Sequence, residues 1–153
     1  MTAPNLFEAN EINVSNKKFD LVILRNIVEH FVDYEKLLSI AASNLTDNGI
    51  IFIRAPNPGS IMLHRYQFNW CMFDDPTHVN FISLNVLERK GKQYGLSLYK
   101  KDFVSSGVLA HYRSQGRTNL SFLSNIFLFL KDLFFNSKSE YRIVFTRKQE
   151  KKQ

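Results

Sequence analysis

An acidic residue and an imidazole stand close behind an apolar run near the start of the chain. The run FDLVIL is followed by Arg25 and Asn26, and shortly afterwards by Glu29 and His30. Side chains three and four residues apart share one side of a helical turn, so Asn26, Glu29 and His30 can point the same way. One glutamate with two histidines suits a borderline divalent cation, and His78 could complete such a set.

The same residues also have plain structural roles, and the sequence favours these roles over metal binding. Glu29 can satisfy backbone donors at the start of a helix, where a negative charge is favourable. His30 can pack with a single hydrogen bond. We therefore expect no divalent metal, and keep Glu29, His30 and His78 as the ligand set if one binds.

A second group of candidate residues lies further along, in an aromatic-rich stretch. An unperturbed imidazole can take a proton from a substrate hydroxyl at neutral pH. His78 is therefore a candidate catalytic base or substrate anchor, and a purely structural role is equally probable. Phe68, Trp70 and Phe73 are expected to line the pocket for that substrate. Asn57, in APNPG, either meets the acceptor through its amide or only turns the chain.

The elements around these residues indicate an α/β fold. Residues 19–24 read as a strand buried on both faces, and residues 50–54 as a second. Between them Asp33 is a helix cap, and Gly49 in TDNG is expected to end the helix in the left-handed conformation. The predicted apolar face of this helix consists of Tyr34, Leu37, Leu38, Ala41 and Leu45. A strand, a helix and a strand in this order predict a parallel pair.

The rest of the chain continues with alternating elements. Residues 60–82 form a long connection, and long ordered loops are commonly functional. A helix capped by Ser83 and ended by Gly95 follows, and residues 96–104 and 140–148 read as strands. The apolar segment 122–135 is shorter than the roughly 20 residues that span a bilayer, so it predicts a buried helix or one lying on a membrane surface.

Composition limits the function classes. The 153 residues fit one domain, with 1–18 irregular, 19–147 structured and 148–153 a basic tail. Half of the formal charge of +6 comes from residues 147–153, which favours a solvated tail over nucleic-acid binding. Cys71 is the only cysteine, which favours a reducing, cytoplasmic location.

Three segments, in order, resemble the carboxy-terminal half of class I S-adenosylmethionine-dependent methyltransferases. They are FDLVILRNIVEHF, LLSIAASNLTDNGIIFIRAPNP and DPTHVNFISLNVLERKGKQYGL. They are similar to the fourth strand with its Glu-His signature, the next helix and strand ending in Pro-Asn, and a later His-containing loop before a helix. The Asp-Pro-Thr-His-Val element further resembles members linked to bacterial surface polysaccharides.

The resemblance implies a partial Rossmann-like sheet and specific site residues. It implies S-adenosylmethionine as cofactor, with main-chain contacts to its methionine part from Leu24, Arg25 and Asn26. The implied acceptor is an oxygen or nitrogen of a small molecule or glycan. In certain relatives a Glu-x-x-Glu-His segment with a distant histidine is associated with a divalent metal, and here Asn26 stands where the first glutamate would be.

The resemblance also implies what this chain lacks. Family members hold the cofactor on a Gly-rich turn after their first strand, and the six glycines here never fall into a G-x-G spacing. In the implied sheet order, the missing first strand would lie beside residues 19–24, leaving that edge open and its side chains uncovered. We therefore expect a fragment that is inactive alone, completed by its own missing half or by a protein partner at this edge. The alternatives are a non-catalytic partner subunit and a membrane-peripheral binding module.

Overall fold

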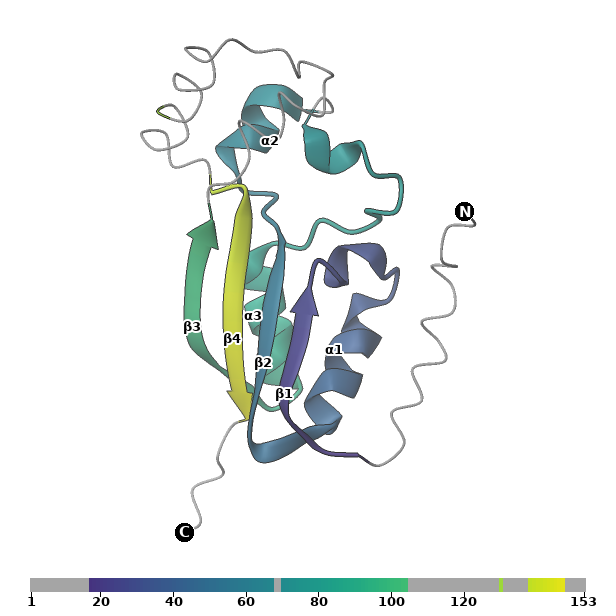
Figure 1. Ribbon diagram of the computed structural model, residues 1–153, viewed down its shortest axis with the longest axis vertical. Coiled ribbons are helices and arrows are strands. Elements are labelled where there is room, and N and C mark those ends of the chain that lie inside the picture. The colour runs from purple at the N-terminus through teal and green to yellow at the C-terminus, as the bar shows by residue number, and fades with distance from the viewer. Residues whose placement is uncertain (1–16, 68–69, 105–129, 131–137, 148–153) are drawn as a thin grey trace.

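The computed structural model describes residues 17–67, 70–104, 130 and 138–147 (Figure 1). Three sequence-based expectations therefore lie outside the described residues. These are the irregular segment up to residue 16, the basic tail 148–153, and the apolar segment 122–135 apart from Leu130.

A four-stranded mixed sheet forms the centre of the molecule, with strand order β1-β2-β4-β3. Its strands are β1 (Phe19–Arg25), β2 (Leu45–Pro56), β3 (Leu96–Val104) and β4 (Glu140–Arg147). β1 and β2 pair in parallel, and β4 runs antiparallel to both β2 and β3. The predicted α/β class with its parallel β1–β2 pair is confirmed.

Two ten-residue helices cover one face of this sheet. α1 (Tyr34–Ser43) and α3 (Leu84–Gln93) both lie behind the strands in Figure 1. Their predicted caps are present, because Asp33 accepts from Lys36 N at 2.9 Å and Ser83 from Val86 N at 3.4 Å. Three short elements complete the described part of the fold: η2 (Val28–His30), α2 (Ile61–Tyr66) and η4 (Cys71–Phe73). The sequence did not predict the helical turns inside the 60–82 connection.

The boundary between α1 and β2 differs from the prediction. TDNG does not end a helix but lies inside β2, which begins at Leu45. Gly49 is not left-handed, since Gly95 is the only glycine with positive φ in the described chain. A Cβ at Gly49 would come within 2.8 Å of the Phe19 carbonyl oxygen, so this glycine permits close approach of β1. Leu45 is fully buried at the start of the strand instead of lying on the helix.

β1 forms an edge of the described sheet, as the sequence predicted. The sequence predicted that the apolar side chains of β1 would all lack cover, and this is correct for only one of the two faces of the strand. Leu21 and Ile23 are 50% and 58% exposed, whereas Leu24 is 7% exposed and Val22 packs against the core. Successive strand residues point to opposite faces, and the helices cover only the face of Val22 and Leu24.

Helix α3 lies so close to β4 that no side chain fits at Gly91. A Cβ there would meet the ring of the buried Phe145 at 2.8 Å. We expect Gly91→Ala to lower the free energy of unfolding by about 1–3 kcal/mol, although alanine is the better helix former. Urea denaturation followed by circular dichroism measures the change.

The matched variant removes the steric cause. Phe145→Leu shortens the ring side chain, so the double variant with Gly91→Ala is expected to lose less stability than the two single losses together. Additive losses would show that the ring contact does not limit the helix position.

Candidate functional site

The loop that follows η4 is fixed to η2 by backbone hydrogen bonds. Val79 N and Asn80 N both donate to the Glu29 carbonyl oxygen, at 2.9 and 3.0 Å. The Asn80 side chain donates to the carbonyl oxygens of Phe31 and Val32. Because η2 directly follows β1, these bonds bring two segments about fifty residues apart together at the carboxyl end of that strand.

This attachment places three titratable side chains next to one another. The ligand atoms of Glu29, His30 and His78 all lie within 4.8 Å of one another. The two imidazole rings are tilted by 59°, with centroids 4.8 Å apart. The sequence predicted these three residues as a possible set, and the structure does bring them together.

Both imidazoles have one ring nitrogen already engaged. His30 Nδ1 lies 3.2 Å from the Thr77 carbonyl oxygen and 2.9 Å from Thr77 Oγ1. His78 Nδ1 lies 2.7 Å from the Met72 carbonyl oxygen. A carbonyl oxygen only accepts, so each Nδ1 carries the proton and each Nε2 keeps its lone pair. This arrangement is typical of histidines that bind metals or accept protons.

Glu29 is the most deeply buried member of the cluster. It is 1% exposed, and within the part of the chain that the structure describes neither carboxylate oxygen has a partner with hydrogen-bond geometry. Burial raises the pKa of this carboxyl, and its own backbone N–H group and the nearby His30 and His78 counteract part of the effect. An unpartnered buried carboxylate is costly, so the site suits a ligand that brings a positive charge or a hydrogen-bond donor.

Asp75 supports the cluster from the exposed side of the loop. It accepts from Thr77 N at 2.9 Å and from the Thr77 hydroxyl at 2.5 Å, and these bonds lower the pKa of its carboxyl. Its Oδ2 lies 3.8 Å from His78 Nε2. Asp75 thereby orients Thr77 so that the threonine oxygen can accept from His30.

Aromatic residues pack beside the cluster, and their expected role in lining an acceptor pocket stays a prediction. Trp70 is fully buried and makes an edge contact with Phe73, at 5.9 Å between centroids. Phe81, which the sequence did not single out, lies 4.5 Å from Phe73 and 6.2 Å from His78. Phe68 lies outside the described residues. Trp70 Nε1 has no hydrogen-bond partner among the described residues.

The residues expected to contact a cofactor lie where β1 ends. The Leu24 side chain is in the core, Arg25 is exposed, and Asn26 has a φ of 52°. Asn26 N donates to the Arg54 carbonyl oxygen at 2.9 Å, which fixes this left-handed exit from the strand. With Leu24 pointing inward, any contact it makes must come from its main chain.

The Asn57 side-chain amide is hydrogen-bonded to nearby backbone groups. Its Nδ2 donates to the Lys138 carbonyl oxygen at 2.8 Å, and its Oδ1 accepts from Gly59 N at 3.0 Å. The side chain is buried, so both ends of the amide are engaged within the fold. Of the two roles that the sequence left open, this geometry favours the turn.

Comparison with known proteins identifies the family. A family model described as a methyltransferase domain matches residues 2–101, well over half of the chain, and the matched range includes Glu29, His30 and His78. The chain belongs to the methyltransferase domain family. No curated protein matches this methyltransferase domain by sequence.

Solved structures share its fold at low sequence identity. A SAM dependent methyltransferase from Archaeoglobus fulgidus matches with a TM-score of 0.55 and 20% identity over 86% of this chain and 60% of its own. The YcgJ protein from Bacillus subtilis matches at 0.59 and 14%, over 93% and 69%. Magnesium protoporphyrin IX methyltransferase from Synechocystis, with bound SAH, matches at 0.54 and 12%, over 88% and 47%. This methyltransferase domain thus spans less than two thirds of the first and third of these proteins.

Three residues near the cluster of this methyltransferase domain were missed by sequence reasoning. Thr77 and Phe81 flank His78 in the same loop, and the Asp-x-Thr spacing of a side-chain turn was a signal for the first. Tyr141 is fully buried on β4, its hydroxyl has no hydrogen-bond partner in the described ranges, and burial together with Glu29 raises its pKa. Nothing in the strand sequence marks Tyr141 as a neighbour of the cluster.

The membrane expectation has one structural test. Among the described residues, no helix has the combined length and apolar character needed to cross a bilayer.

Replacing Glu29 by glutamine tests the burial of its charge. The folded-state pKa is raised, so this carboxyl contributes stability below its ordinary pKa of 4.5, and this contribution is lost as pH rises through the folded-state value. In buffer with EDTA, we expect the stability of the wild type relative to Glu29→Gln to fall as pH rises above 4.5. Urea denaturation over a pH series measures this difference.

Glu88→Gln is the control with the opposite sign. Hydrogen bonds from Lys101 and Lys92 lower the pKa of the Glu88 carboxyl, so the wild type should lose stability relative to this variant as pH falls. A pH-independent difference for Glu29→Gln would contradict an ionisable group held away from water.

Proposed function

We propose that this chain supplies the acceptor side of a S-adenosylmethionine-dependent methyltransferase. The methyl group goes to an oxygen or nitrogen of a small molecule or glycan. The observation that carries the proposal is the Glu29–His30–His78 cluster at the carboxyl end of β1, because this edge of an open α/β sheet is where ligands bind. Membership of the methyltransferase domain family supports the reaction class.

Residues 19–147 supply only some of the cofactor contacts that the proposal needs. Leu24, Arg25 and Asn26 are the residues proposed to contact its methionine part. The remaining cofactor contacts would come from a segment outside residues 19–147, since no Gly-rich turn is present in the sequence. The Archaeoglobus neighbour is SAM dependent and the Synechocystis neighbour holds SAH, which supports the choice of cofactor.

His78 is proposed as base or anchor for the acceptor. When bound, the cofactor supplies a methyl group on a sulfonium sulfur. The acceptor oxygen would take this methyl group, and the sulfur would keep the electron pair of the broken carbon–sulfur bond. The acceptor proton passes to His78 Nε2, which is the ring nitrogen with the free lone pair. Phe81 is the aromatic ring beside this imidazole, and Phe73 and Trp70 pack against Phe81.

A glycan acceptor is the more specific version of this proposal. It rests on the Asp-Pro-Thr-His-Val element, which resembles methyltransferases of bacterial surface-polysaccharide pathways. Sugar hydroxyls donate hydrogen bonds, and the Glu29 carboxylate of the cluster could accept one. We also propose a cytoplasmic location, on the ground of the single cysteine.

The two alternative functions rank behind this proposal. The family match favours methyl transfer over a non-catalytic partner subunit. The membrane-peripheral module depends on residues 122–135, which lie outside the described residues apart from Leu130.

Asn26 gives a test of the cofactor contacts. Its φ of 52° is accessible to glycine but strained for a β-branched residue. Asn26→Gly should keep binding of S-adenosylhomocysteine, and Asn26→Val should weaken it about tenfold or more, from a strain of roughly 1–3 kcal/mol. Isothermal titration calorimetry on the full chain measures both affinities.

Two results would count against the cofactor assignment. One is equal affinity in both Asn26 variants, and the other is no binding at millimolar ligand. Micromolar binding by the chain alone would support the site but contradict the expectation that the chain is incomplete without another segment.

A divalent cation at Glu29, His30 and His78 is a second candidate role for the cluster. The specific observation is that one ring nitrogen of each histidine and a carboxylate oxygen of Glu29 lie within 4.8 Å of one another. Such a set fits a borderline ion better than Mg²⁺ or Ca²⁺, which prefer oxygen ligands. A cation would lower the pKa of an acceptor hydroxyl beside it. His78 Nε2 cannot bind a cation and take the acceptor proton at the same time, so the two proposed roles exclude each other.

Titration with Co²⁺ distinguishes the two roles. If the cluster holds a cation, Co²⁺ should produce visible absorption bands that Zn²⁺ abolishes and Mg²⁺ leaves unchanged. His30→Ala and His78→Ala should each remove the bands, whereas His64→Ala, at an exposed position in α2, should keep them. Absence of bands in the wild type, or bands that persist in His78→Ala, would leave His78 as the proposed base.

A further inference from the structure

Three buried polar groups have no hydrogen-bond partner within the described part of the chain. They are the Glu29 carboxyl, the Tyr141 hydroxyl and Trp70 Nε1. Most buried polar groups in folded proteins are hydrogen-bonded, and the buried Asn57 follows this rule with both ends of its amide. The three unpartnered groups therefore mark places where a hydrogen bond remains to be assigned.

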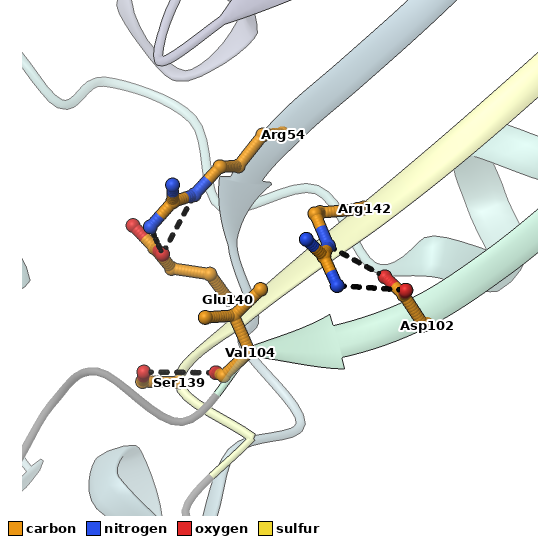
Figure 2. Close-up of polar contacts among 6 residues, drawn as sticks. All are labelled: Arg54, Asp102, Val104, Ser139, Glu140 and Arg142. Atoms are coloured by element: carbon orange, nitrogen blue, oxygen red, sulfur yellow. Dashed lines mark hydrogen bonds and ion pairs between the residues drawn. The ribbon is translucent and has the colours of Figure 1, made fainter.

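The Tyr141 side chain points toward the face of the sheet that carries α1 and α3. Its neighbours on β4, Glu140 and Arg142, point to the opposite face, where Figure 2 shows them paired with Arg54 and Asp102. Tyr141 itself is fully buried in the hydrophobic core. Its hydroxyl therefore lies inside the protein, away from these two ion pairs.

Strand register places Tyr141 at the level of the turn that leads to Glu29. Tyr141 pairs with Ala55 near the end of β2. Asn26, the first residue after β1, donates its N–H to the carbonyl oxygen of the residue before Ala55. Val28, which directly precedes Glu29 in η2, packs in the same core as Tyr141. The phenol and the carboxyl thus approach one buried region at the carboxyl end of the parallel strands.

The Tyr141 hydroxyl and the Glu29 carboxyl are complementary hydrogen-bonding groups. Burial and the Glu29 carboxyl both raise the pKa of the Tyr141 hydroxyl, so the phenol keeps its proton at neutral pH and can donate. Each Glu29 oxygen can accept. Trp70 carries the third unpartnered group, but its ring packs in the loop against Phe73 and Phe81.

We propose that Tyr141 is a positioning residue for the acceptor site, because its hydroxyl donates to the Glu29 carboxyl across at most one bridging water. A water that joins two buried polar groups is an ordinary part of a protein interior. The bond fixes one carboxyl oxygen and so sets the direction in which the other faces His30 and His78. The bond itself follows from burial and register, whereas its consequence for methyl transfer rests on the proposed function.

Packing alone does not account for a tyrosine at this position. The ring of phenylalanine would fill the same space in the core. The additional hydroxyl of Tyr141 costs free energy on burial unless it is hydrogen-bonded. The same cost applies to the Glu29 carboxyl, so a bond between the two removes both.

Nuclear magnetic resonance of the full chain, labelled with ¹³C at tyrosine Cζ, tests the bond. The chain has six tyrosines, and Tyr141→Phe identifies the Tyr141 signal by removing it. We expect Glu29→Gln to shift this signal, because glutamine keeps the shape of the side chain but replaces one acceptor oxygen by an amide donor. The matched change Glu88→Gln should leave the signal in place, since Glu88 pairs with Lys92 and Lys101.

A double-mutant cycle measures the same bond through stability. We expect the losses in the free energy of unfolding caused by Tyr141→Phe and Glu29→Gln to be non-additive. Tyr34→Phe is the control, because this tyrosine packs against the same core but donates to Glu35 at 3.4 Å. Its loss should add to that of Glu29→Gln. Urea denaturation at neutral pH with EDTA measures each variant, after circular dichroism has verified its fold.

Three results would overturn the proposal. They are a Tyr141 signal that Glu29→Gln leaves unshifted, additive losses in the cycle, and non-additivity of Glu29→Gln with Trp70→Phe in place of Tyr141→Phe. None of these measurements uses S-adenosylhomocysteine or Co²⁺. Failure of cofactor binding would therefore count against the proposed methyl transfer alone, and the bond between Tyr141 and Glu29 is judged separately.

Discussion

The site depends on one carbonyl group. The Glu29 carbonyl oxygen accepts hydrogen bonds from two successive backbone N–H groups, those of Val79 and Asn80. This bifurcated attachment fixes the aromatic loop to the turn after β1 and so places His78 beside His30. Without it, the loop would be held at the end of the sheet only by side-chain contacts, which are the bonds of Asn80 to the Phe31 and Val32 carbonyl oxygens, the His30–Thr77 contact and the packing of aromatic rings. The geometry of the cluster thus depends in part on main-chain bonds, which impose no requirement on side-chain identity.

Main-chain control explains which parts of the structure could be read from the sequence. The α/β class, the β1–β2 pair and both helix caps follow from apolar runs and capping residues, which act locally. The cluster residues were recognisable as chemical types at suggestive spacing. Their convergence required knowledge of the loop path, which depends on bonds between residues far apart in sequence.

The sequence-based predictions that proved wrong also have physical causes. TDNG has the composition of a helix stop, but the need to pair with β1 extends β2 back to Leu45, and tertiary pairing overrides local turn preference. The apolar run of β1 suggested uniform loss of cover, whereas strand alternation divides it between two faces. Tyr141 could not be linked to Glu29 from sequence, because β4 enters the sheet from the far end of the chain.

The contact between Gly91 and Phe145 has a consequence beyond local packing. The loop that carries His78 runs directly into α3 through the Ser83 cap, so α3 anchors one end of the loop and η2 anchors the other. The distance between helix and sheet is set by a residue with no side chain. The absence of a side chain at Gly91 thus fixes the seat of the helix from which the His78 loop starts its path back to η2.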